Sequence, residues 1–281
     1  MKHVFLTRYN LPSAGVESQF RARDNWLRDR TVLFNRYTVP SMKNQLSDEV
    51  SWIVYIDPAS PAWLVDHLGS LEADQLLTAI PRASVSREEL VGDIRTLVGE
   101  ASGPLITTNI DNDDALARDF SERLRSFGRT QTERCGVYIG RGLVLNGARL
   151  YLRRDPENAF CSVVEDLSDP VTCWVDWHNR LSRHMPVITL EGDPGWLQVI
   201  HDVNVSNIVR GRRVPSAGYR VAFPRLLDDV ADPSQREASR ELLLTWPLRT
   251  LRDALRTGSR RAAVRLLGKN RFDALKERRG Q

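Results

Sequence analysis

Short apolar runs alternate with segments of helical spacing through the first 130 residues, and this alternation limits the folds open to the chain. Strand-like runs occupy Lys2–Thr7, Ser51–Asp57 and Leu105–Thr108. Helical patterns occupy Phe20–Phe34, the segment after Ser86, and Leu116–Phe127. Strands that alternate with helices pair in parallel through right-handed crossovers. We therefore expect an α/β fold whose first part is a parallel βαβ arrangement.

Capping and helix-breaking residues mark the ends of the predicted helices. Ser86 and Glu89 form a capping box, and the helix that follows them should stop at Gly99. Gly128 should end the next helix, and the first helix should end before Pro40. These signals place both ends of the middle helix and one end of each of the others.

Beyond Cys135 the pattern changes to short strand-like runs with few helical intervals. The runs are GVYIG, LVLNGARLYL, CSVV, TCWV and VITL. Asn146-Gly147 in the second run indicates a hairpin with a type I′ turn. Asp193-Pro194 predicts a helix that carries Trp196 and ends near His201, with Asp as N-cap and Pro at the first helical position. The second half should therefore contain a mixed sheet.

Composition places the chain among globular proteins. With 281 residues and 41% apolar content, it can bury the core of one large α/β domain. No apolar stretch has membrane-spanning length, and the start lacks the pattern of a secretory signal, so we expect a cytoplasmic protein. The three cysteines have no Cys-x-x-Cys spacing, and we expect them to be buried, reduced thiols.

The positive charge of the chain is concentrated at its end. Residues 249–281 contain eleven Lys or Arg against three Asp or Glu, whereas the whole chain has a net charge of only +4. Apolar residues recur there at helical intervals, so this segment could rest on an anionic membrane surface as basic amphipathic helices. A helical extension with a solvated basic face is the other interpretation. Confinement of the charge to this segment argues against nucleic-acid binding.

Three carboxylates follow the third apolar run in the stretch GPLITTNIDNDDALARDF. Asp111, Asp113 and Asp114 would lie at the carboxyl end of a parallel strand, which is where open α/β sheets bind ligands. Carboxylates that close together repel one another and raise one another's pKa, unless a cation lies between them. One or two carboxylates with water and phosphate oxygens suit Mg²⁺ or Mn²⁺.

Other interpretations of the acidic stretch remain open or can be excluded. Asp114 could cap the helix that follows, although this accounts for only one of the three acids. A solvated acidic turn is also open. A calcium-binding EF-hand is excluded because its sixth position, which needs glycine, is Leu116.

Five stretches in a fixed order give the chain a resemblance to a known family. They are FLTRYN, WLRDRTVLFNRYTVPSMKNQ, WIVYIDPASP, TTNIDNDDAL and WLQVIHDVNVSN. Over about its first 210 residues the sequence resembles the rhamnosyltransferases, which are glycosyltransferases of the GT-A fold. The resemblance implies a GT-A-like domain over residues 1–230, with a nucleotide-sugar-binding half to about residue 130 and a mixed-sheet acceptor half over 131–230. Residues 231–281 would form a basic helical extension.

The resemblance also implies a donor and an acceptor. The donor would be a nucleoside-diphosphate sugar such as dTDP-rhamnose, and the acceptor a glycan or glycolipid. Thr7 and Arg8, at the end of the first strand, would touch the donor's base or diphosphate. Asp57, at the end of the second strand, would accept a hydrogen bond from the base or ribose.

A metal site is implied in the same way. Asp111, Asn112 and Asp113 match the Asp-x-Asp motif whose carboxylates meet Mn²⁺ or Mg²⁺ and the sugar nucleotide. His201 would match a histidine that GT-A enzymes often bring as a further metal ligand. An isolated histidine is otherwise more often a structural hydrogen-bonding residue.

Sugar transfer with inversion at the anomeric carbon also needs a general base. Glu165 and Asp166 follow a short strand in a position reminiscent of the acidic pair of GT-A enzymes, and Asp176 in CWVDWH is the next candidate. Two other functions are considered. A sugar-phosphate nucleotidyltransferase would need a glycine-rich phosphate loop, which TRYNLPSAG matches poorly. A non-catalytic protein that binds nucleotide sugar or a membrane surface is the other.

Overall fold

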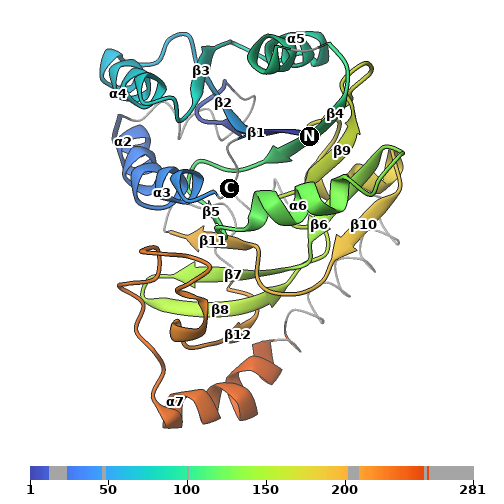
Figure 1. The fold of residues 1–281 in the computed structure, drawn as a ribbon. Coiled ribbons are helices and arrows are strands. Elements are labelled where there is room, and N and C mark those ends of the chain that lie inside the picture. The colour runs from blue at the N-terminus through green and yellow to red at the C-terminus, as the bar shows by residue number, and fades with distance from the viewer. Residues whose placement is uncertain (13–23, 46–48, 100, 202–208, 250–251, 253–281) are drawn as a thin grey trace, which may run out of the picture.

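The computed structural model describes residues 1–12, 24–45, 49–99, 101–201, 209–249 and 252. The strands in these residues form one large and one small sheet (Figure 1). The large sheet has seven strands in the order β10-β6-β9-β4-β1-β2-β3. Its members are β1 (Lys2–Arg8), β2 (Val50–Ile56), β3 (Thr78–Pro81), β4 (Pro104–Asn109), β6 (Cys135–Ile139), β9 (Ser162–Asp166) and β10 (Val187–Leu190).

The directions of the strands show where their carboxyl ends lie in the large sheet. β1 pairs in parallel with β2 and β4, β2 with β3, and β6 with β10. β9 pairs antiparallel with both β4 and β6, and so runs opposite to the other six described strands. The carboxyl ends of β1, β2, β4 and β6 therefore meet at one edge, and the carboxyl end of β9 lies at the other.

The small sheet continues from this edge. Its order is β12-β8-β7-β11-β5, and its strands are β5 (Ala115–Leu116), β7 (Arg141–Asn146), β8 (Arg149–Arg154), β11 (Trp196–Ile200) and β12 (Arg212–Arg213). β5 pairs antiparallel with β11, and β11 pairs in parallel with β7. The acidic stretch joins β4 to β5, so it connects the two sheets.

Helices cover both faces of the large sheet. On one face lie α2 (Asp24–Leu33), η1 (Phe34–Thr38), α3 (Val39–Lys43), α4 (Ala62–Ala73) and α6 (Phe120–Gly128), and on the other lie α5 (Arg87–Val98) and η2 (His178–Arg183). The remaining described helices, η3 (Ala217–Tyr219), α7 (Gln235–Arg240) and η4 (Glu241–Thr245), lie beside the small sheet. The predicted capping box is confirmed at α5, where the Ser86 side chain accepts from the Glu89 amide. Gly99 ends α5 with a left-handed φ of 69°, as predicted.

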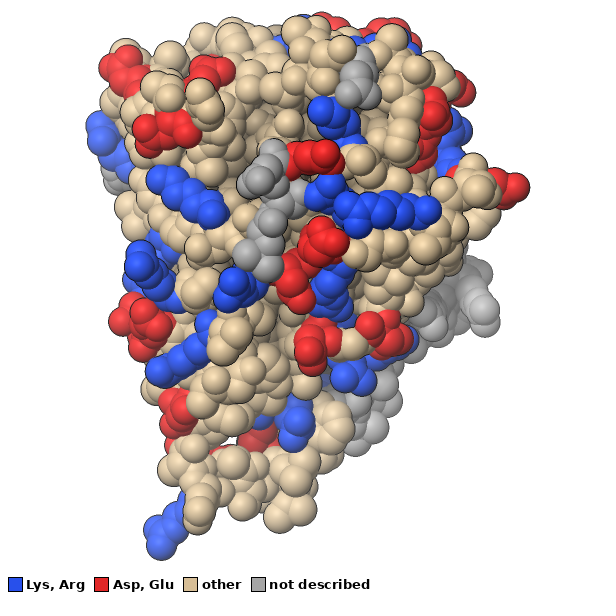
Figure 2. Space-filling model, viewed as in Figure 1, with Lys and Arg blue, Asp and Glu red and all other residues tan. Residues whose placement is uncertain are grey.

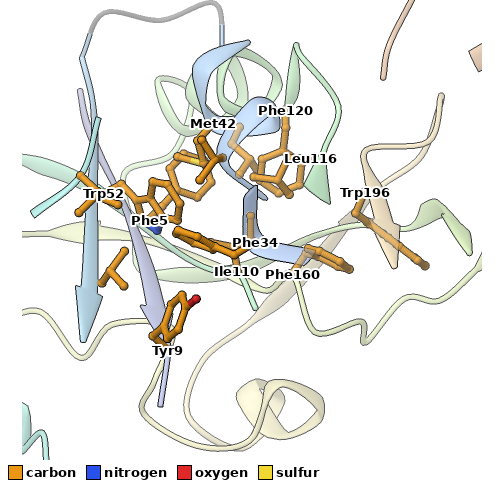
Figure 3. Packing of buried hydrophobic residues seen from close by; sticks show 14 of the residues in the cluster. Phe5, Tyr9, Phe34, Met42, Trp52, Ile110, Leu116, Phe120, Phe160 and Trp196 are labelled. Atoms are coloured by element: carbon orange, nitrogen blue, oxygen red, sulfur yellow. The ribbon is translucent and has the colours of Figure 1, made fainter. Parts of the chain in front are cut away.

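Alternating side chains of the large sheet contribute to two of the three hydrophobic clusters in the described residues. Phe5 of β1 packs with Phe34, Met42 and Phe120 on the side of α2, η1, α3, α4 and α6 (Figure 3). Val4 of β1 joins a second cluster with residues of α5 and η2 on the opposite face. This two-sided burial is what a sheet covered by helices on both faces requires.

The helix predicted from Asp193-Pro194 is wrong. Trp196–Ile200 forms strand β11 instead, between β7 and β5 in the small sheet. Four of its five residues are buried, which a strand lying inside a sheet requires and a one-sided helix does not. His201 therefore lies at the end of a strand.

Smaller predictions also need correction. The chain remains helical through Pro40, which lies near the start of α3. TCWV is not a strand, because Thr172 has a left-handed φ of 66°. The predicted hairpin is present between β7 and β8, but its two loop residues are Gly147 and Ala148, and the φ of Gly147 is 55°, as in a type II′ turn.

Two further boundaries differ from the prediction. Leu116 belongs to β5, so α6 begins only at Phe120. Residues 20–23 of the first predicted helix lie outside the described residues. Strands β6, β9 and β10 extend the same sheet as β1–β4, so the large sheet continues across the expected division near residue 130. The predicted α/β class, with a parallel βαβ part and a mixed part, is confirmed.

Two predictions from composition can be compared with the structure. Cys135, Cys161 and Cys173 are free and buried, as predicted. Among the residues that the structure describes, no helix has the length and apolar character needed to span a bilayer.

Candidate active site

The loop between β4 and β5 is fastened to β1. The Ile110 amide donates to the Leu6 carbonyl at 3.1 Å, and the Thr7 hydroxyl donates to the Ile110 carbonyl at 2.8 Å. The Trp52 indole N–H in turn donates to the Thr7 hydroxyl at 2.9 Å. Thr7, predicted to touch the donor, is fully buried, and its hydroxyl is engaged in holding this loop.

Asp111 and Asn112 point in different directions from the loop. Asp111 is exposed, and the side-chain amide of Asn109 donates to its Oδ1 at 3.4 Å. Desolvation by the surrounding protein atoms is the largest effect on the Asp111 carboxyl, and it raises the pKa. The negative charge of Asp113 raises the pKa further, against smaller opposing effects that include the charge of Arg30. Asn112 is buried and donates to the Tyr9 carbonyl at 2.8 Å. Asn112 thus fixes the loop to the end of β1, and Asp111 faces solvent.

Asp113 contacts side chains from two other segments of the chain. Its Oδ2 atom lies 2.9 Å from Nε2 of His201 and forms an ion pair with the Arg30 guanidinium. Arg30 also donates to Oδ1 of Asn112 at 3.3 Å. The structure therefore brings Asp113 and His201 together, as the resemblance implied, and adds the arginine from α2.

Asp114 has a structural position. Its Oδ1 accepts the Val199 amide of β11 at 2.8 Å, and its carbonyl accepts the Thr38 hydroxyl at 2.8 Å. Burial, and then the charges of Asp113 and Asp111, raise the pKa of its carboxyl well above the usual range. Asp114 is not a helix cap, because α6 begins at Phe120.

Arg8 and Trp174 form a stacked pair at the end of β1. The guanidinium carbon of Arg8 lies 4.0 Å from the centre of the Trp174 ring. Arg8 is nevertheless an exposed residue. The Trp174 indole N–H donates to Oδ1 of Asn109, the last residue of β4, at 2.8 Å. An arginine held in this way presents its planar set of N–H donors at the same edge as the aspartate loop.

Asp57 closes the turn after β2. Its backbone amide donates to Oδ1 of Asn10 at 3.0 Å, and its Oδ1 accepts the Ala59 amide at 2.8 Å. Asn10 also donates to the Ser60 hydroxyl at 3.0 Å. The turns that follow β1 and β2 are therefore hydrogen-bonded to each other at the carboxyl edge of the parallel strands.

Glu165 and Asp166 lie away from this edge. In the antiparallel pair of β9 and β4, Glu165 stands opposite Leu105 and Asp166 opposite Pro104, at the start of β4. Four residues of strand, about 13 Å, separate Leu105 from Asn109 at the other end. Neither acid is therefore brought to the aspartate loop, contrary to what their position after a short strand had suggested.

The buried Glu165 carboxylate instead supports the segment that carries Trp174. It accepts the Val171 and Thr172 amides, each at 2.8 Å, and pairs with Arg134 at 3.0 Å. Burial raises the pKa of its carboxyl, and the two backbone hydrogen bonds and Arg134 oppose this shift. Glu165 therefore fixes the left-handed backbone at Thr172, two residues before Trp174.

Asp176 follows Trp174 in the same segment. Its Oδ1 accepts the Trp177 amide at 2.7 Å, and its Oδ2 lies 3.2 Å from His184 Nε2. These two contacts lower the pKa of the Asp176 carboxyl, so the group is ionised at neutral pH. Of the three acids expected as a base, Asp176 is the one whose segment reaches the edge that carries Arg8.

The residues around Asp113 can be tested for their fit to a divalent cation. Carboxylate oxygens and an imidazole nitrogen are the donor types that Mn²⁺ accepts, and Asp111, Asp113 and His201 supply them. Within the described ranges, however, the structure contains no group of three or more His, Cys, Asp or Glu side chains arranged around a common point. The types of ligand atom therefore suit Mn²⁺ or Mg²⁺. In this structure, however, the Asp113 carboxylate forms its ion pair with Arg30.

Arg30 is one residue that sequence reasoning missed. It lies within WLRDR, one of the stretches that carry the family resemblance, but nothing in its local spacing indicates a partner in the aspartate loop. Asn109 was also missed, although it ends the strand before the motif.

Comparisons with solved structures give matches of low identity. S. aureus TarS is 10% identical, with 71% of this chain and 37% of that chain covered and a TM-score of 0.42. A structure of residues 1–349 of TarS is 8% identical, with 71% and 60% covered and a TM-score of 0.40. The chain thus spans less than two thirds of both TarS chains.

One further solved structure, a "putative nucleotide-diphospho-sugar transferase" from Desulfovibrio desulfuricans G20, is 9% identical, with 72% and 83% covered and a TM-score of 0.39. A search of curated proteins found no match. The model of the family described as "Putative rhamnosyl transferase" matches residues 2–213, which is most of the chain. The protein therefore belongs to this rhamnosyl transferase family.

Proposed function

We propose that the protein is a metal-dependent glycosyltransferase that moves a sugar from a nucleoside-diphosphate donor to a glycan or glycolipid acceptor. The family description supports rhamnose as the sugar, and we propose dTDP-rhamnose as the donor. The observation that carries the proposal is the convergence of Asp113, His201 and Arg30 at the carboxyl edge of the parallel strands. Ligands of open α/β sheets bind at this edge.

Each residue at this edge is proposed to bind a different part of the donor. The Arg8 guanidinium is proposed to bind the diphosphate, since its planar donors match phosphate oxygens. Asp57 is proposed to accept a hydrogen bond from the base or ribose. Asp111, Asp113 and His201 are proposed to hold Mn²⁺ or Mg²⁺, with Asn112 fixing the loop beside the nucleotide. A bound cation of this kind would neutralise charge that develops on the departing diphosphate.

Asp176 is the proposed base. Its ionised carboxylate would take the proton of the acceptor hydroxyl while that oxygen forms a bond to the anomeric carbon and the bond to the diphosphate oxygen breaks. Attack opposite the leaving group inverts the anomeric centre. Glu165 and Asp166 are not proposed as bases, because they lie at the other edge of the sheet.

The test is a screen of nucleotide sugars for hydrolysis and transfer, with and without Mn²⁺. With a donor that is turned over, Asp113→Asn should lower the rate by about 100-fold or more, because the carboxylate charge is lost while the shape is kept. Asp193→Asn, an exposed acid on the loop before β11, is the matched control and should keep the rate. Turnover that needs no cation, or full activity of Asp113→Asn, would refute the metal-dependent mechanism.

A further inference from the structure

We propose that Arg30 is a donor-binding residue that exchanges partners during the catalytic cycle. In the free protein its guanidinium neutralises Asp113. When a divalent cation occupies Asp113, the guanidinium leaves and binds the diphosphate of the donor. This inference rests on the function proposed above and assigns a role to a residue of α2 that the motif does not include.

The position of Arg30 is well defined in the free protein. It lies in the last turn of α2, and its side chain is 16% exposed, against 8% for Asp113. Its guanidinium contacts Asp113 and Asn112, and lies 5.3 Å from the centre of the Trp26 ring. An ion pair this far out of water is stronger than a surface pair and leaves a costly charge behind when one partner is removed.

A cation and the guanidinium compete for the same atom. Oδ2 of Asp113 already contacts both Arg30 and His201 Nε2. A Mn²⁺ or Mg²⁺ ion would lie about 2.0–2.2 Å from a ligating carboxylate oxygen, inside the space of a guanidinium that donates to that oxygen. Two cationic groups so close would also repel each other strongly in a site with little water. Binding of a metal at Oδ2 of Asp113 would therefore require Arg30 to move.

The diphosphate is the natural destination for the released guanidinium. A cation held at Asp113 would share its coordination shell with phosphate oxygens of the donor, as Mg²⁺ commonly does with substrate phosphates. Arginine binds phosphate through two parallel N–H donors. Asn112 remains fixed by its hydrogen bond to the Tyr9 carbonyl, so the loop keeps its place while the side chain turns. Arg8 and Arg30 would then hold the diphosphate from β1 and from α2.

The experiment measures binding without turnover. Mn²⁺ is titrated into the full-length protein without nucleotide and followed by electron paramagnetic resonance of free Mn²⁺; dTDP, UDP and GDP are then titrated at saturating Mn²⁺ by calorimetry. Arg30→Gln should bind Mn²⁺ roughly tenfold more tightly than the native protein, because the competing cation is gone. The same variant should bind the nucleoside diphosphate roughly tenfold more weakly.

Two further variants sharpen the result. Arg28 is an exposed arginine of the same helix, and its guanidinium lies over the Trp63 ring. Arg28→Gln should change neither affinity. Arg30→Lys keeps the charge and should keep the native Mn²⁺ affinity, but should weaken nucleoside-diphosphate binding because the bidentate contact is lost.

The outcomes separate this inference from the proposed function. Native protein that binds neither Mn²⁺ nor any of the three nucleoside diphosphates would refute the proposed function. Native protein that binds both, with Arg30→Gln unchanged or with weaker Mn²⁺ binding, would refute the exchange and leave the proposed function standing. Circular dichroism spectra that match the native protein establish that each variant is folded.

Discussion

His3 is a fully buried histidine in β1, an interior strand of the large sheet. Its Nδ1 lies 2.8 Å from the Ser121 hydroxyl, and its Nε2 lies 2.8 Å from the Thr108 hydroxyl. Burial, and then the charge of Arg125, lower its pKa from 6.5 to about 3. The folded protein therefore keeps this imidazole neutral at pH values where the unfolded chain binds a proton.

This difference predicts a loss of stability in acid. Below pH 6.5 the unfolded state gains a proton that the folded state takes up only near pH 3, so the free energy of unfolding falls between these values. The effect is at most about 1.4 kcal/mol per pH unit, or about 2 kcal/mol between pH 6.5 and 5. Urea unfolding of the native protein and His3→Gln at both pH values measures it. The variant should show a smaller pH dependence than the native protein; equal slopes for native protein and His3→Gln would contradict the assignment.

Some residues of the site can be predicted from sequence, and others cannot. Asp111 and Asp113 follow a recognisable apolar run, so their place at the end of a strand could be read directly. The contact between Asp113 and His201 came from the family resemblance rather than from local pattern. Arg30 meets Asp113 only through the packing of α2. Glu165 lies at the opposite edge of the sheet because β9 runs antiparallel to its neighbours. The amino-acid composition of β9 does not indicate that direction.

Strand β11 illustrates how tertiary packing decides the type of an element. Trp196 stands beside Gly142 of β7, so that a Cβ atom on Gly142 would lie 1.9 Å from the indole ring. The Trp196 ring also stacks on Phe160, with 5.2 Å between ring centres, and its N–H donates to the Ile139 carbonyl at 2.9 Å. Figure 3 shows these two rings side by side. The tryptophan thus fixes the register of the small sheet.

Replacing this glycine should therefore be costly. Gly142→Ala should lower the free energy of unfolding by about 3 kcal/mol, because the methyl group has no space unless Trp196 moves. Gly92→Ala in α5 is the matched control. Among the described residues, no heavy atom beyond its chain neighbours and its own helix backbone lies within 4 Å of the new methyl group. This variant should raise the free energy of unfolding by up to about 1 kcal/mol. Urea unfolding monitored by tryptophan fluorescence compares the two. Equal stabilities would mean that the contact does not fix the strand.

The same contacts explain why the helix predicted from Asp193-Pro194 failed. The local capping signal was genuine, but Gly195 packs against Ile139, with only 2.7 Å from a Cβ position to the nearest side-chain atom. Strand formation depends more on such neighbours than on intrinsic propensity. By contrast, α5 carried its capping box and terminal glycine in its own sequence, and both were predicted.

Across the whole molecule, charge and exposed apolar surface are unevenly distributed. Figure 2 shows acidic and basic side chains interspersed over the described surface on that face, whereas residues 249–281 carry the positive excess of the sequence. Just before them, Leu243 is 72% exposed and Leu244 56%, and Leu248 is 63% exposed. Exposed leucines followed by a basic amphipathic sequence suit an anionic lipid surface.

We therefore expect the protein to sediment with anionic vesicles. Deletion of residues 249–281, or the pair Leu243→Ser and Leu244→Ser, should each reduce the bound fraction several-fold at moderate salt. Val221→Ser, which removes a 76% exposed apolar residue elsewhere, is the control and should bind as the native protein does. Hydrolysis of a soluble donor should be retained in all three. Sedimentation that is unchanged by the deletion and by the leucine pair would end the membrane proposal.

The loop between β4 and β5 is bonded to Leu6 near the start of the chain and to Val199 far downstream. During synthesis, the nascent chain can complete most of the large sheet before it can complete this loop, because the partner of Asp114 has not yet left the ribosome. A fragment limited to the first 130 residues would likewise lack the hydrogen bond from Val199 to Asp114, the residue next to Asp113. The loop that would hold the proposed donor is thus completed only after Val199 has been synthesised.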